Sequence, residues 1–203
     1  SFCTVLFILV STHWFNRERI TECAVMIQNQ VELLETLLTD WQDALGADYD
    51  AYRNHCYRVL NVTLQLAPQS PDNLQKVAVA VAFHDLAIWA KQTFDYIEPS
   101  ADMARSWLLA NGHAEWVDEV LAMIRLHHKM TPCSAQSTVL IESFRQADWC
   151  DVSLGLLRFK LNKAFLVELK QQFPNAGFHR RLVQLSGRQL VRHPFNPLPM
   201  MRW

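Results

Sequence analysis

The chain has 203 residues, half of them hydrophobic and 19% charged, which is an ordinary balance for a globular protein with one sizeable core. Its formal net charge of −1 gives no bulk attraction to a nucleic-acid polymer or to an anionic membrane. The 5 glycines are too few for the many tight turns of an all-β fold, and the 5 cysteines include no C-x-x-C pair. We therefore expect a helical cytoplasmic protein with free thiols.

The first 25 residues differ in character from the rest. Their apolar run, residues 2–10, is far shorter than the roughly 20 residues that a membrane span needs. No basic residue precedes this run, as a secretory signal would require. We treat residues 1–25 as an N-terminal extension. It is either translated from upstream of Met26 or is a short element that packs on the domain or on a second subunit.

Apolar periodicity predicts a series of helices. Over residues 26–45 the apolar positions recur at intervals of three, four and seven, which predicts an amphipathic helix that ends near Gly46. Further helices are predicted over residues 50–68, 74–91, 101–111, 114–129, 137–150, 152–161, 162–173 and 177–192, with a loop over 92–100 and Ser100 as an N-cap. We expect one all-α domain over residues 26–193, a bundle of about seven or eight helices, and an irregular tail over 194–203.

The central predicted helix carries the most informative stretch of the sequence. Residues 77–90 read VAVAVAFHDLAIWA, with His84 and Asp85 side by side in an otherwise apolar run. Burying an imidazole and a carboxylate is costly unless something pairs with them. A divalent metal ion is one such partner, because it supplies positive charge and takes N and O ligands. A buried His–Asp hydrogen bond that only holds the core together is the alternative.

Other predicted helices carry further side chains of the same kind. His55 lies at the edge of the apolar face of the helix predicted over residues 50–68, and His127 and His128 end a later helix. Asp148 lies near the C-terminal end of its predicted helix, where the helix dipole disfavours a carboxylate. An aspartate in that place needs a compensating partner.

The order of these residues, H…HD…H…D on four successive predicted helices, resembles the HD-domain superfamily of metal-dependent phosphohydrolases, over roughly residues 52–151. The resemblance implies four metal ligands: His55, His84, Asp85 and Asp148. This donor set suits Mn²⁺, Fe²⁺, Co²⁺, Ni²⁺, Mg²⁺ or Zn²⁺, and we expect one divalent ion per chain. Such an ion would activate a water for attack on a small phosphorylated metabolite or nucleotide. Candidates for holding the phosphate or protonating the leaving oxygen are Arg58, His127, His128 and Lys129.

The sequence also departs from parts of that superfamily. Subfamilies that hydrolyse nucleoside monophosphates or guanosine tetraphosphate carry an acidic residue three or four positions after the HD aspartate. Here those positions are Ile88 and Trp89. Asp95 and Glu98 are therefore our candidates for orienting the attacking water.

Two other functions stay open at this stage. The di-iron oxygenase branch uses further histidines between HD and the last aspartate, and His127 or His128 is available for a second ion. His113 lies in an Asn-Gly-His turn, where we expect a capping role. No GYP-type motif follows, which argues against the branch of the superfamily that hydrolyses cyclic dinucleotides. A degenerate HD domain that binds a nucleotide or a partner helix is the non-enzymatic alternative.

As partners we expect a small phosphorylated substrate, no nucleic-acid polymer and no membrane. A homodimer through the N-terminal run or the tail is a further possibility.

Overall fold

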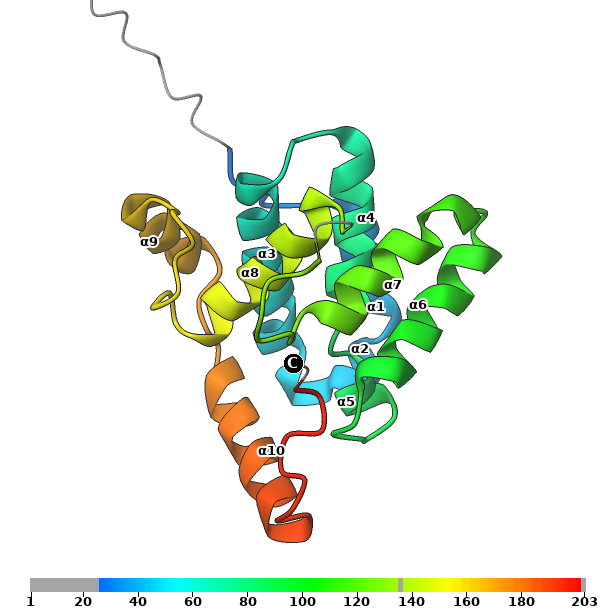
Figure 1. Cartoon of the computed structure of the whole chain (residues 1–203), viewed down its shortest axis with the longest axis vertical. Helices are drawn as coiled ribbons and strands as arrows, with labels where there is room; N and C mark the ends of the chain where they lie inside the picture. Colours follow the sequence, from blue (N-terminus) through cyan, green and yellow to red (C-terminus); the bar gives the residue numbers. More distant parts are fainter. Residues whose placement is uncertain (1–25, 135–136, 202–203) are drawn as a thin grey trace, which may run out of the picture.

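The computed structural model describes residues 26–134 and 137–201 (Figure 1). The expectations for residues 1–25 lie outside these residues. Within the described part the elements are helices, so the predicted all-α class is confirmed. None of these helices is long and apolar enough to cross a membrane.

The helices begin and end as follows. In chain order they are α1 (Glu32–Asp40), α2 (Gln42–Leu45), the 3₁₀ turn η1 (Gly46–Asp48), α3 (Tyr49–Leu66), α4 (Pro71–Phe83), α5 (Ala87–Ala90), α6 (Ile97–Ala110), η2 (Ala114–Trp116), α7 (Val117–Leu126), α8 (Val139–Val152), α9 (Lys163–Gln172) and α10 (Phe178–Arg192). Helices α1 to α8 form one bundle, and α9 and α10 lie at its margin (Figure 1).

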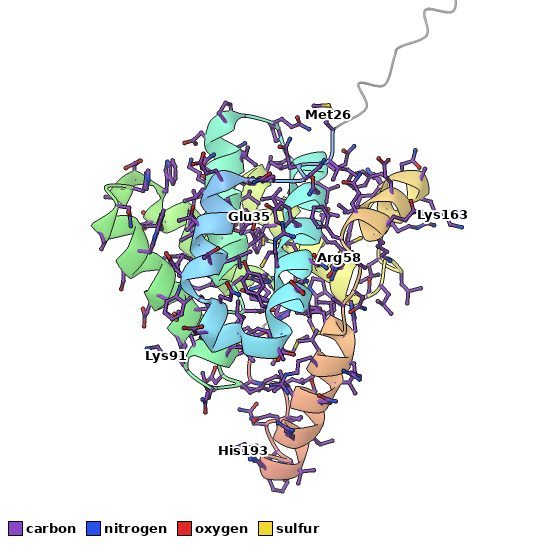
Figure 2. The ribbon with its side chains drawn as sticks, turned by 180° about the vertical axis from the view of Figure 1, so that it is seen from behind. Met26, Glu35, Arg58, Lys91, Lys163 and His193 are labelled. Atoms are coloured by element: carbon purple, nitrogen blue, oxygen red, sulfur yellow. The ribbon has the colours of Figure 1, made fainter. Side chains whose placement is uncertain are left out.

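Helices α3 and α4 form the centre of the bundle. Helix α3 packs on both α8 and α4, while α4 also packs on α1, α6 and α7. Every side chain from Val77 to Phe83 is buried, which explains why this part of α4 has no polar face. On the rear of the bundle, Glu35 of α1 accepts hydrogen bonds from Arg53 and Tyr57 of α3 (Figure 2). The core therefore fixes helix α3, which carries His55, against helix α4, which leads into His84.

Several predicted boundaries differ from the observed ones. The first helix begins at Glu32, because the preceding residues are extended and tied to α3, where the Tyr57 hydroxyl lies 2.9 Å from the Val31 N–H. Helix α6 begins four residues early, and Ser100 lies inside it rather than capping it. Its hydroxyl instead accepts a hydrogen bond from the N–H of Ala87 at 3.2 Å. The helix predicted over residues 152–161 is absent from the described chain, which there forms turns with positive φ at Leu154 and Phe159.

The helix predicted over residues 74–91 is interrupted at its most informative point. Helix α4 ends at Phe83, and His84, Asp85 and Leu86 form a turn before α5. The backbone bonds tighten there: the N–H of Leu86 reaches the carbonyl of Phe83, and that of Ile88 reaches Asp85, both at 3.0 Å. These are three-residue bonds of the 3₁₀ type. The apolar pattern runs through the break unchanged and gave no sign of it.

Helix α10 projects away from the bundle, and its far end at His193 lies well outside the other helices (Figure 2). Its first residue, Phe178, is buried, and His179 Nε2 lies 3.0 Å from the Asp151 carbonyl oxygen. The segment after α10 turns back toward the bundle (Figure 1), where Met200 is buried. Helix α10 is thus held against the bundle chiefly at its N-terminal end.

Candidate metal centre

Six predicted residues meet in the middle of the bundle. They come from four places in the fold: α3, the turn after α4, the turn after α7, and α8. Five of them are buried and the sixth, His128, is partly exposed; the set is His55, His84, Asp85, His127, His128 and Asp148. The structure therefore brings together the four ligands that the resemblance implied and adds both histidines of the later pair.

The first ligand group consists of His55, His84 and Asp148. The Nε2 atoms of the two histidines are 2.9 Å apart. Asp148 Oδ1 lies 3.6 Å from Nε2 of His55 and 3.9 Å from Nε2 of His84. All three donor atoms face one small space, as a metal ion requires.

The second ligand group consists of Asp85, His127 and His128. Asp85 Oδ1 lies 3.3 Å from His127 Nε2, and its other oxygen lies 3.5 Å from His84 Nε2 in the first group. Asp148 likewise turns Oδ2 toward His128 Nδ1, at 3.4 Å. Both carboxylates thus reach across the two groups. The sequence led us to expect one ion per chain, and the structure offers donors for two.

Each histidine is oriented by the ring nitrogen that faces away from the centre. Nδ1 of His84 lies 2.9 Å from the Val81 carbonyl oxygen, and Nδ1 of His127 lies 2.6 Å from that of Ile124. A carbonyl oxygen only accepts, so these nitrogens carry the protons and Nε2 is left as a lone-pair donor. For His128 to bind through Nδ1, its Nε2–H must donate to the Tyr96 hydroxyl oxygen, 2.6 Å away. Outer partners of this kind are typical of metal-binding histidines.

The donor atoms lack partners of their own. Asp85 Oδ1, both carboxylate oxygens of Asp148 and His127 Nε2 are buried with no hydrogen-bond partner in the described part of the chain. The Nε2 atoms of His55 and His84 face each other at 2.9 Å, so either a proton on one of them or a cation shared by both must lie between them. Buried unpaired polar atoms each cost about 1–3 kcal/mol. The residues therefore fit a divalent cation better than they fit a purely structural cluster.

Burial shifts the pKa values of this cluster strongly. It lowers the pKa of His84 to about 3, so that imidazole is neutral and able to bind a metal. Burial also raises the pKa of Asp148 to about 7; His127 and His55 oppose this rise, and Asp85 and Asp151 add to it. His84 and His127 outweigh burial at Asp85 and hold the pKa of that carboxyl well below its usual range, so Asp148 is the carboxyl that needs further positive charge to stay fully ionised at neutral pH. A divalent ion would supply that charge.

Arg58, predicted to hold phosphate, lies outside the centre. Its guanidinium is buried and binds Asp151 through Nε at 2.6 Å and Nη2 at 2.9 Å, and it donates to the Phe173 carbonyl at 3.0 Å. Asp151 Oδ2 in turn accepts the Nδ1–H of His55 at 2.7 Å. Arg58 therefore acts on the centre only through Asp151, because its donors are already occupied.

The remaining predicted residues also face elsewhere. The ammonium of Lys129 is bonded to Thr131 and to the Pro132 carbonyl. Asp95 is exposed in a loop where its backbone N–H donates to Thr93 Oγ1. Glu98 is exposed and its carboxylate accepts from Arg125 Nε at 2.9 Å. None of these contacts brings Lys129, Asp95 or Glu98 to the metal ligands.

Three residues at the centre were missed from the sequence. Asp151 orients His55, and its position three residues after Asp148 on one helix face was the signal available. Tyr96 holds His128 through its hydroxyl group. Phe178 stacks on the His55 ring, with centroids 4.0 Å apart. Its position on a distant helix left no signal in the sequence.

Comparison with known proteins points to the part of the chain that contains the two ligand groups. A family model described as HD domain matches residues 52–153, half of the chain. These bounds contain all six residues of the two ligand groups. No curated protein and no solved structure matches the chain.

Proposed function

The chain belongs to the HD domain family, within a superfamily of metal-dependent phosphohydrolases, and on that premise we propose that it hydrolyses a phosphoester of a small metabolite or nucleotide with two divalent ions. The proposal rests on one observation: there are two ligand groups, and Asp85 and Asp148 each turn one carboxylate oxygen toward the other group. Carboxylates that reach two ions are the usual way to hold a pair about 3.5–4 Å apart. The cysteines that the structure describes are free, which supports a reducing, cytoplasmic location.

The donor set suits this chemistry in its charge. When bound, two divalent ions lower the pKa of a water molecule and withdraw charge from a phosphoryl group. The protein offers neutral imidazoles and only two carboxylates, Asp85 and Asp148, so the loaded centre keeps a net positive charge. That excess favours a phosphate substrate and its transition state. The enclosing residues Phe178 and Tyr96 are buried, and they exclude bulk water from the centre.

The test compares metal content and hydrolysis in three proteins: wild type, Asp85→Asn and His113→Ala. His113 is the matched control, because it stacks between Trp107 and Trp116 and is not part of either ligand group. Elemental analysis should find about two transition ions per chain in the wild type and the control, and at most one in the Asp85 variant. Hydrolysis of p-nitrophenyl phosphate and a nucleotide panel should fall by at least about 100-fold in that variant.

Full hydrolysis by a metal-free Asp85→Asn protein would reject the proposal. A wild-type protein that binds no ion when it is refolded with Mn²⁺, Fe²⁺ or Ni²⁺ would favour a binding module without catalysis.

A di-iron oxygenase is the second candidate. It requires two ions per chain, and the two ligand groups favour that stoichiometry. Iron in both sites, with substrate-dependent oxygen uptake and no phosphoester hydrolysis, would select it. Hydrolysis supported by Mn²⁺ or Ni²⁺, which do not carry out this oxygen chemistry, would select the phosphohydrolase.

A further inference from the structure

A polar cavity lies apart from the metal centre. It has a volume of about 610 Å³ and lies between α10 and the segments around α2 and α5. Its wall on the α10 side is formed by Arg181, Leu185, Arg188, Gln189 and Arg192. Intervals of four and seven residues place these on one face of the helix. No residue of the two metal-ligand groups lines it.

The charges around this cavity are predominantly positive. Three arginines line it against one acidic residue, Asp48. Asp48 is already engaged, since its Oδ2 lies 2.8 Å from the Arg181 Nε and accepts the Trp89 indole N–H at 2.8 Å. Arg188 and Arg192 are exposed, and no ion pair or hydrogen bond of their guanidinium groups is seen in the described residues. In a chain whose net charge is −1, two such arginines one helical turn apart give this wall a local positive charge.

The opposite wall carries aromatic and aliphatic side chains beside polar ones. Ile88, Trp89 and Phe94 line it together with Leu45, next to Gln92 and Thr93. The Trp89 indole is held in place by its bond to Asp48 and by the Tyr52 ring, 5.0 Å away between centroids. Tyr52 also stacks on His84, so these two aromatic rings separate the cavity from the metal ligands. A ligand here would need an anionic part for the arginines and an apolar part for this wall.

We propose that this cavity binds an organic polyphosphate of the nucleoside triphosphate type, with its phosphates on Arg188 and Arg192 and its organic part against Trp89 and Phe94. Guanidinium groups bind phosphate oxygens in pairs, and the adjacent polar side chains of Gln189 and Gln92 add donors at the rim. The site is distinct from the centre where hydrolysis is proposed, and it does not depend on that proposal.

The experiment measures binding by titration calorimetry on the full chain stripped of metal with EDTA. ATP is the probe, and the variants are Arg188→Ala/Arg192→Ala and Arg180→Ala. Arg180 is a matched control, because it is an exposed arginine of the same helix that does not line the cavity. The double variant should bind ATP at least about tenfold more weakly, and the control should bind as the wild type does.

Two further arms separate the parts of the ligand. Inorganic tripolyphosphate should bind more weakly than ATP, and adenosine should bind more weakly than either. Equal loss of ATP binding in the Arg180 variant would show diffuse attraction and overturn the proposal. So would loss in Asp85→Asn with binding intact in the double variant, since the anion would then occupy the metal centre. Absence of ATP binding by the wild type, or equal affinity for tripolyphosphate, would also overturn it.

Discussion

Asp151 connects the candidate metal ligand His55 to the buried guanidinium of Arg58. One of its oxygens accepts the Nδ1–H of His55 at 2.7 Å, and the carboxylate as a whole binds the Arg58 guanidinium. Burial works to raise the pKa of Asp151, but His55 and Arg58 outweigh it and hold that pKa well below its usual range. The carboxylate is therefore charged in the folded protein. It fixes the tautomer that leaves His55 Nε2 free for an ion.

We predict that Asp151→Asn and Arg58→Gln separate stability from metal binding. Each change breaks the buried ion pair, which should lower the free energy of unfolding by about 3–5 kcal/mol. Only Asp151→Asn also removes the carboxylate from His55, so only this variant should lose metal affinity, by about 10–100-fold. Urea denaturation and metal titration would check both effects. Equal metal affinity in the two variants would show that Asp151 does not orient the ligand.

At this scale the sequence identified residues that the structure brings together, but it did not identify the residues that orient them. His55, His84, Asp85 and Asp148 were predicted from the order of residues that resembles the HD domain, and the structure places all four in one cluster. Arg58 was predicted to hold phosphate, but its guanidinium binds Asp151. Whether a side chain faces the centre or its outer shell depends on packing between helices, which spacing does not determine.

Helix α8 holds the turn that carries His127 and His128. Arg145 Nη1 and the Trp149 indole both donate to the Lys129 carbonyl, at 3.0 and 3.2 Å. Glu142 anchors Arg145 through both carboxylate oxygens and accepts the backbone N–H of Cys133 at 2.9 Å. This one carboxylate therefore ties the segment after α7 to α8.

We predict that this anchor gives a pH-dependent part of stability. Burial works to raise the pKa of Glu142, but bonds from Arg145, Cys133 and Gln146 outweigh it and lower the pKa from 4.5 to about 2. A group whose pKa is lower when folded stabilises the fold above its unfolded pKa, and that contribution is lost as the pH falls toward 2. Glu142→Gln should therefore be less stable than wild type at pH 6, and the gap should shrink as the pH falls below 4.5. A pH-independent gap in urea denaturation would contradict this.

Helical periodicity predicted most elements and missed the break between α4 and α5. Residues around His84 remain apolar on both sides of the turn, so the pattern gives no reason to stop the helix there. The break is instead stabilised by tertiary contacts, such as the Ser100 hydroxyl that accepts the N–H of Ala87. It lets adjacent His84 and Asp85 turn toward one centre, which a straight helix would oppose. Such contacts come from distant segments and are not visible locally.

On the scale of the whole molecule, the centre joins helices that are far apart in the sequence. His55 on α3 and Asp148 on α8 lie at opposite ends of the matched region, and their donor atoms are 3.6 Å apart. An ion bound between them exists only in the folded chain. Metal binding is therefore coupled to the stability of the entire bundle.

We predict that metal loading raises the midpoint of thermal unfolding. At about 100 times its dissociation constant, an ion that binds only the folded state stabilises it by about 2.7 kcal/mol. For a chain of this size that corresponds to a rise of about 5–10 °C, measured by calorimetry with and without EDTA. His113→Ala should show the same rise and Asp85→Asn a smaller one, since that variant keeps at most one ion. An identical rise in Asp85→Asn would place the stabilising ion elsewhere.

The enclosure of the ligands governs the time over which ions exchange. With His55 and His84 at 0% exposure and Asp148 at 1%, an ion leaves only when the bundle opens locally. Loading during folding is then fast and later replacement slow, whatever the relative affinities. The metal carried by a purified sample will record the ions that were abundant in the cell where the chain folded. The ion that supports function best must be identified by refolding the protein in each metal.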